Sequence, residues 1–336
     1  MRHRSPDRVS AGAVSRRAPI GGGGVTPPTP VPRAMKLSVV ILNSNAAKDT
    51  AASVRAIQAW DFPGGVGRPE VWVVDNGSGP PGIAPIRREF PEVHAIESPV
   101  NRGFAGGSNL GIRAALDGGS EAVLLLNNDA AVDAPSVAAL LATLGSDPSI
   151  GVVGPTLWHR EQCISVGGRN IARHANTHLR PRVPPAAPLD VDYVPGTVAL
   201  VRREVFDRVG LLDEDYFFAG EMADLCRRAR AAGFRSVTEP RARASHNLDR
   251  SARDRQTLHI YYLVRNRFLF VRKHVPRGRG WLYARWTARA ALTALAAAAR
   301  GRFARVRAVA HGVVDGLGGR VGAQPDRVRR DPPRRP

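Results

Sequence analysis

The sequence predicts an α/β fold in which helices flank a doubly wound, mostly parallel sheet, followed by a C-terminal helical extension. Short apolar runs alternate with segments of helical spacing from about residue 37 to residue 150, as in strand–helix–strand units joined by right-handed crossovers. The first run, "KLSVVILNSN", is almost continuously apolar and ends in polar residues, which is typical of a parallel strand buried on both faces. With 336 residues and 43% hydrophobic content, the chain can bury a full core.

The expected elements follow in a regular order. After the first strand come a helix in "AASVRAIQAW", a strand in "EVWVVDNGS", a helix in "GIAPIRREF", a strand in "VHAIESP", a glycine-rich turn into a helix in "GGSNLGIRAAL", and a strand in "EAVLLLNNDA". Beyond residue 150 the alternation weakens, and the expected strands are "GVVGPTLW", "CISVGGRN", two in "VDYVPGTVALVRREVFDRVG" before a helix, "RSVTEP" and "ARASHN". Residues 173–190, rich in Pro and Arg, indicate a surface loop. Glycine is expected to end the helix "EMADLCRRARAAG" at Gly233.

Composition divides the chain into four parts. Residues 1–34 mix Arg, Pro and Gly without an apolar core, so we expect a disordered leader and not a signal peptide. Met35 directly precedes the first strand, and translation could start there. Residues 35–275 form the α/β domain, residues 276–322 a basic amphipathic helical extension, and residues 323–336 a disordered tail. No run of about 20 apolar residues indicates a membrane-spanning helix.

The chain is strongly basic, with 49 Lys and Arg against 29 Asp and Glu and a formal charge of +20. Such a surface attracts polyanions, including nucleotides and acidic lipids, although a coding bias towards arginine would give the same composition. Cys163 and Cys226 lie far apart without metal-ligand spacing. They indicate neither a zinc site nor a disulfide framework, and a reducing compartment fits best.

Polar side chains follow three strands at their carboxyl ends. In doubly wound sheets, ligands bind at this edge, near the point where the strand order reverses. Asn and Asp also cap helices and start turns, which would explain any one of these positions alone. Because they occur at equivalent places on three strands, we interpret them as a binding rim. Its members are Asn43 and Asn45 after the first strand, Asp75 and Asn76 after the second, and Asn127, Asn128 and Asp129 after the fourth.

Asp129 ends the apolar run "LLLNNDA". A carboxylate in this place suits Mg²⁺ or Mn²⁺, which can take one or two protein oxygens and complete their coordination with substrate phosphates. Such a cation can neutralise a diphosphate leaving group. A simple Asn-Asp turn is the alternative interpretation.

Six segments carry a resemblance to a known family. In order they are "LSVVILNSN", "VVDNGS", "NRGFAGGSNLG", "LLLNNDA", "FFAGEMADLCRRARAAGF" and "YYLVRNRF", from about Leu37 to Phe270. With these segments the chain resembles the family 2 glycosyltransferases of the GT-A fold, in particular the bacterial rhamnosyltransferase-like branch. The resemblance implies inverting transfer of a sugar, rhamnose in that branch, from a nucleotide-diphosphate donor to a cell-envelope glycan or polyprenyl-linked acceptor.

Matching positions imply the donor and metal sites. Asp75 matches the acid that hydrogen-bonds the nucleotide base. Asn127 and Asp129 match the ends of the family's Asp-x-Asp metal motif, but Asn in the first position leaves the cation one carboxylate fewer. His246 in "ASHN" matches a histidine that can reach the metal or the diphosphate, although a lone His is more often a packing or surface residue without a binding role. The segment beside the nucleotide sugar is matched by Asn101, Arg102, Gly103, Gly106 and Asn109.

The resemblance also implies a catalytic base at the start of the helix "EMADLCRRARAAG". The family has a Glu-Asp pair behind an aromatic segment, and its second acid takes the proton of the acceptor hydroxyl. Here Glu221 keeps the first position, but Met222 stands in the second. Three readings stay open: Glu221 is the base, Asp224 has taken the role, or the chain is a catalytically impaired relative. Asp224 also fits a first-turn acid paired with Arg227 or Arg228, so Glu221 is the favoured base.

The extension and the rival functions complete the expectations. From Trp281 to Gly319, tryptophans and leucines interleave with arginines, as in helices that lie on anionic membranes; packing on the domain or a dimer contact would give the same pattern. We expect a cytoplasmic protein, and the first of these interpretations would place it peripherally on the inner face of the cytoplasmic membrane. A nucleotidyltransferase would show a basic Gly-rich loop after the first strand, where only Lys48 occurs. A nucleic-acid-binding protein would need stacking aromatics among its basic runs, so no nucleic acid partner is expected.

Overall fold

The computed structural model describes residues 35–62, 67–183, 185–247 and 253–324. The expected leader (residues 1–34) lies outside them, as does most of the expected tail. The strands are β1 (Leu37–Asn43), β2 (Glu70–Asn76), β3 (His94–Ser98), β4 (Ala122–Asn127), β5 (Ala130–Val132), β6 (Ile150–His159), β7 (Gln162–Ser165), β8 (Leu189–Val191), β9 (Val198–Arg202) and β10 (Arg235–His246). The helices are α1 (Ala47–Gln58), α2 (Ala84–Glu89), α3 (Gly103–Asp117), α4 (Ala134–Ser146), α5 (Arg203–Val209), the 3-10 helix η1 (Glu214–Tyr216), α6 (Glu221–Ala231), α7 (Arg253–His274), α8 (Arg279–Ala298) and α9 (Phe303–Gly318).

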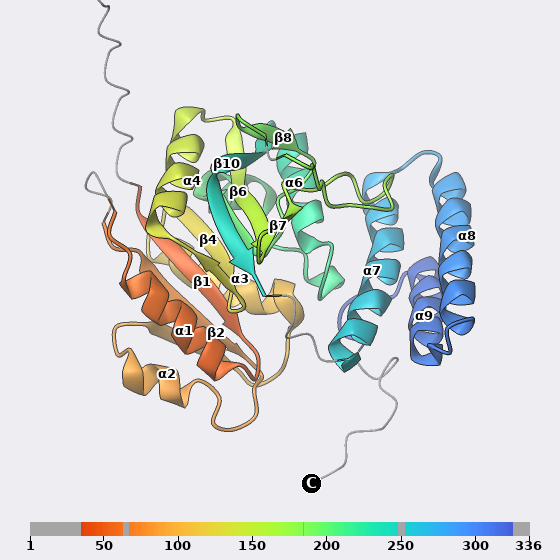
Figure 1. Ribbon diagram of the computed structural model, residues 1–336, viewed down its shortest axis with the longest axis horizontal. Coiled ribbons are helices and arrows are strands. Elements are labelled where there is room, and N and C mark those ends of the chain that lie inside the picture. The colour runs from red at the N-terminus through yellow and green to blue at the C-terminus, as the bar shows by residue number, and fades with distance from the viewer. Residues whose placement is uncertain (1–34, 63–66, 184, 248–252, 325–336) are drawn as a thin grey trace, which may run out of the picture. The chain divides into compact units, whose positions relative to one another are not determined.

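One sheet contains the described strands, in the order β3-β2-β1-β4-β9-β6-β10-β5, with β7 beside β6 and β8 beside β10 (Figure 1). The strands β3, β2, β1 and β4 run parallel, whereas β9 runs antiparallel to both β4 and β6. From β1 the chain moves outward to β3 and then returns to β4 on the other side of β1. The strand order therefore reverses between β1 and β4, where α/β sheets bind ligands.

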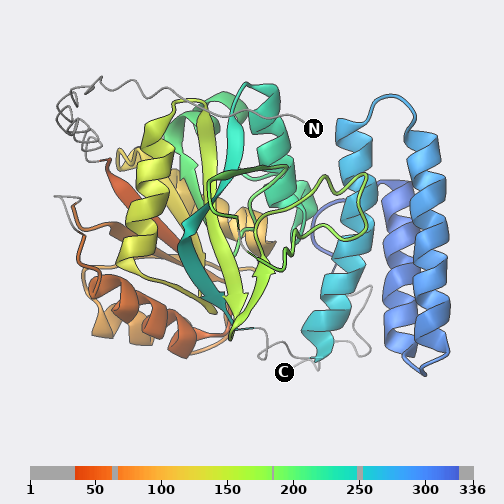
Figure 2. The same cartoon turned by 45° about the horizontal axis from the view of Figure 1, so that its top comes forward.

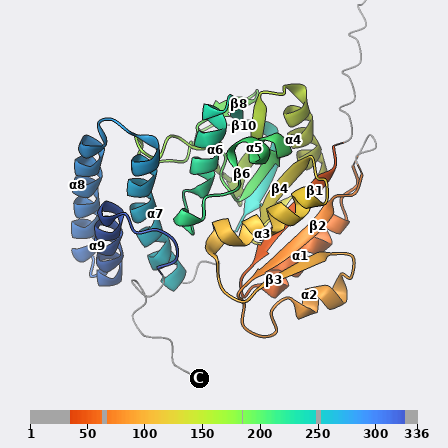
Figure 3. The ribbon, with the colours of Figure 1, turned by 180° about the vertical axis from the view of Figure 1, so that it is seen from behind.

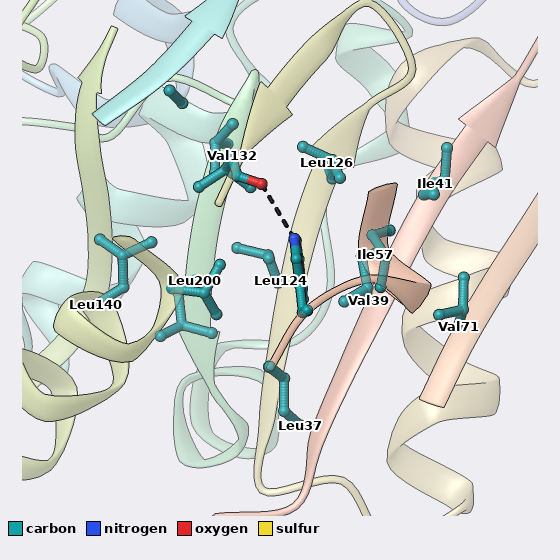
Figure 4. Close-up of a cluster of buried hydrophobic side chains, with 14 of the residues drawn as sticks. Leu37, Val39, Ile41, Ile57, Val71, Leu124, Leu126, Val132, Leu140 and Leu200 are labelled. Atoms are coloured by element: carbon teal, nitrogen blue, oxygen red, sulfur yellow. Dashed lines mark hydrogen bonds between the residues drawn. The ribbon is translucent and has the colours of Figure 1, made fainter. Parts of the chain in front are cut away.

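Helices cover both faces of the sheet, as Figures 1 and 3 show from opposite sides. Alternate residues of a strand point to opposite faces, so Val39 and Ile41 pack with residues of α1, α2 and α4, whereas Val40 packs with α3. Figure 4 shows the first of these clusters, in which the Trp60 indole N–H donates to the carbonyl of Val132 at 3.2 Å. The predicted α/β class with a flanked, mostly parallel sheet is confirmed.

Two elements differ from the sequence pattern. Helix α3 begins at Gly103, three residues before the expected helical segment "GGSNLGIRAAL", which starts at Gly106. A Cβ on Gly107 would lie 2.5 Å from Leu42, and one on Gly111 would lie 2.6 Å from Val40. At these two positions inside the helix, glycine lets α3 pack closely on the sheet. The two strands expected in "RSVTEP" and "ARASHN" form the single strand β10, whose register against β6 shifts between Glu239 and Arg243.

The C-terminal helices α7, α8 and α9 pack together (Figure 2). Helix α7 joins them to the core, since Phe268, Leu269 and Val271 belong to the cluster that also contains residues of α3, α5 and α6. Gly301, with a φ of 66°, lies in the turn between α8 and α9. None of the helices in the described ranges combines the length and apolar character needed to cross a bilayer.

Candidate active site

A chain of hydrogen bonds links the ends of β1, β2 and β4. Asn43 and Asp75 are paired in register, and Asn43 Nδ2 donates to Asp75 Oδ1 at 3.0 Å. Thr50 of α1 donates to Asn43 Oδ1 at 2.9 Å and accepts from Asn128 Nδ2 at 3.0 Å. Ser78 donates to Asp75 from the loop after β2. The structure thus brings together rim residues that follow three different strands.

The neighbouring loops are tied to this rim. Asn45, with a φ of 53°, accepts from the Gly79 N–H at 3.0 Å, and its own N–H donates to Ser78 Oγ at 2.8 Å. Its side chain therefore joins the loop after β1 to the loop after β2. At the end of β4, the Asn127 N–H donates to the carbonyl of Thr197 at 3.0 Å.

Asn76 and Asn101 shape the start of α3. Asn76 Nδ2 donates to the Gly103 carbonyl at 2.9 Å, and its Oδ1 accepts from the Arg102 N–H at 2.8 Å. Asn101 Oδ1 accepts from the Gly103 N–H at 2.8 Å. Gly103 has a φ of 72°, and a Cβ there would lie 2.2 Å from the Phe217 carbonyl oxygen. The segment expected beside the donor sugar therefore packs directly on the aromatic run that precedes α6.

Gly106 and Asn109 lie further along α3 and face the segment from Leu212 to the start of η1. Asn109 Nδ2 donates to the Leu212 carbonyl at 2.8 Å and to Glu214 Oε1 at 3.0 Å, while its Oδ1 accepts from the Leu212 N–H at 3.0 Å. A Cβ on Gly106 would lie 3.1 Å from Glu214 Oε2. The Asn109 amide holds this segment against α3 and does not join the rim network.

Asp129 and His246 meet where β4 ends. Strand β5 follows Asp129 directly and pairs antiparallel with β10, which places His246 opposite Ala130. His246 Nε2 lies 3.4 Å from Asp129 Oδ1, and the Asn247 N–H donates to the Asp129 carbonyl at 3.0 Å. A cavity of about 450 Å³ opens beside this pair, lined also by residues of α1 and by His159. Neither Asp75 nor Glu221 lines that cavity.

Glu221 begins α6 after a run of unusual backbone conformations. Phe217, Ala219 and Gly220 have φ values of 60°, 69° and 108°, a region that residues other than glycine rarely adopt. Backbone strain of this kind persists only where the surroundings hold it, and it gathers at functional sites. The run directs Glu221 into the protein, where the residue is only 7% exposed.

Two residues of α7 hold this strained segment. Asn266 Nδ2 donates to the carbonyls of Tyr216 at 2.9 Å and Phe218 at 2.8 Å, and also contacts that of Ala219. The guanidinium of Arg265, which is fully buried, donates to the Tyr216 carbonyl at 2.8 Å. Both belong to "YYLVRNRF", which sequence reasoning noted without assigning a role. In the sequence, the signal that could have drawn attention to them is an Arg-Asn pair between the aromatic residues of that segment.

Burial raises the pKa of Glu221 to about 7, and the charge of Asp224 adds to this, while hydrogen bonds from the backbone of Glu221 itself and of Ala219 oppose it. Among the described residues, Glu221 Oε2 has no hydrogen-bond partner. A buried carboxyl with an open oxygen and a pKa near neutrality is suited to accept a proton.

Asp224, one turn later, has the opposite environment. Its carboxylate accepts from Arg228 Nε at 2.7 Å and from the Tyr216 hydroxyl at 3.3 Å, and His274 Nε2 lies 2.7 Å away. Burial alone would raise the pKa of Asp224, but hydrogen bonds from His274 and Arg228 together with the Arg228 charge outweigh it, and the pKa is lowered. Asp224 therefore stays ionised and links α6 to α7.

Met222 is buried, 3% exposed, between these two acids. A Cβ on Gly196 would lie 3.0 Å from Met222 Cγ and 3.2 Å from Phe104 Cζ. Residue 222 thus faces the loop whose next residue, Thr197, bonds the end of β4. A thioether cannot take a proton at this place.

The model of the family described as "Glycosyl transferase family 2" matches residues 38–210, just over half of the 336-residue chain. The chain belongs to glycosyl transferase family 2. Its matched region includes the rim residues and Asp129, whereas Glu221 and His246 lie beyond it.

Curated relatives of this family 2 chain include transferases of two kinds. The low-salt glycan biosynthesis hexosyltransferase Agl10 of Haloferax volcanii is 28% identical over 245 residues, covering 69% of this chain and 74% of the relative. The N-acetylglucosaminyl-diphospho-decaprenol L-rhamnosyltransferase of Mycobacterium tuberculosis is 28% identical over 252 residues, covering 66% of this chain and 80% of the relative. The predicted likeness to rhamnosyltransferases of family 2 is confirmed.

Solved structures support the fold. A mannosyltransferase of Pyrobaculum calidifontis, determined with GDP-Man and Mn²⁺, has a TM-score of 0.57 at 17% identity and covers 85% of this chain and 88% of its own. GalNAc-T7, determined with UDP, GalNAc and Mn²⁺, has a TM-score of 0.58 at 17% identity and covers 75% of this chain and 50% of its own. The family 2 chain therefore has the GT-A fold.

Proposed function

We propose that this family 2 glycosyltransferase moves a sugar, with inversion, from a nucleotide-diphosphate donor to a hydroxyl of a cell-envelope glycan or polyprenyl-linked acceptor. The observation that carries the proposal is the buried Glu221 carboxyl, with its raised pKa and open oxygen. It lies at the end of the aromatic run on which the start of α3 packs. The rhamnosyltransferase of Mycobacterium tuberculosis among the relatives supports rhamnose as the first sugar to test.

The donor is proposed to bind along the rim. Asp75 would accept from an N–H of the nucleotide base, and the start of α3 would lie beside the sugar and diphosphate. Arg102 is the charged residue in that segment, and its Nε donates to Ser98 Oγ at 3.2 Å. The rim network holds Asn43 and Asp75 in fixed positions before the donor arrives, which lowers the entropic cost of binding.

The residues beside β4 fit a divalent cation, Mg²⁺ or Mn²⁺. Asp129 offers a carboxylate oxygen, the kind of ligand that suits Mg²⁺ and Mn²⁺, and His246 offers an imidazole nitrogen 3.4 Å from it. The described residues contain no group of three or more ligands that could hold a cation unaided, so donor phosphates and water would complete the coordination. When bound, the cation would neutralise charge on the diphosphate.

In the proposed reaction, the acceptor oxygen forms a bond to the anomeric carbon as the bond from that carbon to the diphosphate oxygen breaks. The Glu221 carboxylate takes the hydroxyl proton, and the diphosphate departs with the bonding electrons. General-base assistance of this kind contributes about 10²–10⁴-fold. Asp224, with its pairing to Arg228 and His274, holds the first turn of α6 and does not exchange protons.

The test is hydrolysis and binding of dTDP-, UDP- and GDP-sugars, rhamnose donors first, with Mg²⁺, Mn²⁺ or EDTA. Turnover of one donor that requires the cation would support the proposal. If every donor binds and none turns over with any acceptor or cation, the chain is not a transferase.

Met222 favours one second candidate, a catalytically impaired relative that binds nucleotide sugars or glycans. In this case the missing acid at position 222 has disarmed the site. Met222→Asp would then raise turnover by about 10²-fold or more. If Glu221 is the base, the same change buries a second carboxylate beside Glu221 and lowers turnover.

A further inference from the structure

Helix α8 carries two apolar stripes on different sides. The buried stripe consists of Leu282, Trp286, Ala290 and Ala297. The other stripe is exposed and also repeats at helical spacing. Trp281 is 71% exposed, Leu292 67% and Leu295 66%. A large apolar surface left in water on one helix marks an interaction site.

Four arginines surround a groove next to this stripe. The groove has a volume of about 370 Å³ and runs between α8 and the start of α9. Its apolar floor contains Leu292, Ala296 and Ala297. No ion pair joins any of the four guanidinium groups to a carboxylate in the described ranges. The arginines are Arg289, Arg300, Arg302 and Arg305.

The surrounding sequence is free of acidic residues. Residues 275–314 contain eight arginines and no Asp or Glu. Asp315, the first acid beyond them, is buried and paired with Arg320 and Tyr261. Two copies of such a surface would repel each other, which disfavours a dimer contact. An apolar stripe edged by unpaired arginines is complementary to an anionic bilayer, whose headgroups meet the guanidinium groups while apolar side chains enter the interface.

We propose that the exposed face of α8 and the arginine groove form a docking surface for anionic lipid headgroups of a bilayer. Trp281, Leu292 and Leu295 enter the interfacial layer, and the groove binds lipid phosphates. Neither the site at Glu221 nor the pair of Asp129 and His246 contributes a residue to this docking surface. Lipid binding is therefore independent of the proposed reaction.

The test is flotation of the full chain with vesicles of phosphatidylcholine alone and of phosphatidylcholine with phosphatidylglycerol. Two quadruple variants remove the same charge from different places. The groove variant is R289Q/R300Q/R302Q/R305Q. The matched control removes four exposed arginines of the α/β domain and is R68Q/R88Q/R113Q/R208Q.

Wild type and the control variant are expected to float with anionic vesicles, and the groove variant to bind at least about tenfold more weakly. A third variant, W281S/L292S/L295S, is expected to lose the binding that remains at high salt. Thermal melting is the control that each variant is folded. Equal losses in the groove and control variants would mean charge attraction without a site, and failure of wild type to bind anionic vesicles would overturn the proposal. If the apolar variant instead converts a dimer into a monomer without changing flotation, the stripe is a contact between copies and the proposal is wrong.

Discussion

Glu221→Gln should stabilise the protein at neutral and alkaline pH while it removes activity. The pKa of Glu221 rises from 4.5 to about 7 in the fold. One pKa unit corresponds to about 1.4 kcal/mol, so the ionised carboxyl costs the folded state about 3 kcal/mol at pH 8. Glutamine has nearly the same shape and no charge to desolvate. The free energy of unfolding of the variant should therefore exceed that of wild type by up to this amount at pH 8.

The sign of the pH dependence follows from the raised pKa. Below about pH 4.5 both states hold the proton, and the ionisation cost is absent. Between about pH 4.5 and 7 the unfolded chain loses its proton first, so the free energy of unfolding falls as pH rises. In Glu221→Gln this fall should disappear. The gap between wild type and variant should therefore be small near pH 5 and reach about 3 kcal/mol near pH 8.

Urea denaturation at several pH values, followed by tryptophan fluorescence, measures this gap. Asp224→Asn is the matched control, because the pKa of this carboxyl is lowered and its loss leaves Arg228 without its ion pair. The free energy of unfolding of this control should be about 3 kcal/mol lower than that of wild type at neutral pH. A Glu221→Gln variant that is less stable than wild type at pH 8 would refute the assignment of a desolvated carboxyl with an open oxygen.

Four further substitutions test other parts of the site. Asn266→Ala leaves carbonyls of the strained segment without a donor and should lower the free energy of unfolding by about 2–4 kcal/mol. Steady-state kinetics should show kcat reduced by about tenfold with the donor KM unchanged. An unchanged kcat would assign Asn266 to stability alone. Gly103→Ala places a Cβ against the Phe217 carbonyl and should lower the free energy of unfolding, measured by thermal or chemical denaturation, by about 2 kcal/mol or more. An unchanged free energy of unfolding would contradict the close contact. Asp129→Asn and His246→Ala should each weaken Mn²⁺ binding in the presence of a nucleoside diphosphate by about tenfold or more, measured by titration calorimetry, and unchanged affinity in both would move the metal elsewhere.

The sequence predicted the sheet well because its first half is built from local patterns. Buried strands such as β1 and β4 appear as short apolar runs, and each ends where its polar residue reaches the rim. The start of α3 was expected three residues late, at Gly106, because Gly103 has the positive φ of a turn glycine and still begins the helix. The single strand β10 was read as two because its bulge looks like a break.

The site was predictable only where strand ends carry it. Asn43, Asp75 and Asn128 meet because parallel strands place their carboxyl ends together. Pairing of Asp224 with Arg228 follows from helical spacing, but the contact with His274 joins residues 50 positions apart. Similarly, the role of Asn266 depends on carbonyls 47 to 50 positions away, and no local pattern encodes such a contact.

The role of Glu221 as the base is tested most directly by the pH dependence of donor turnover in wild type and Glu221→Gln. We expect wild-type turnover to rise with pH through about 7, as Glu221 loses its proton. We also expect the variant to bind the donor normally but to turn it over about 10²–10⁴-fold more slowly. A Glu221→Gln variant with wild-type turnover and the same pH profile would contradict this role.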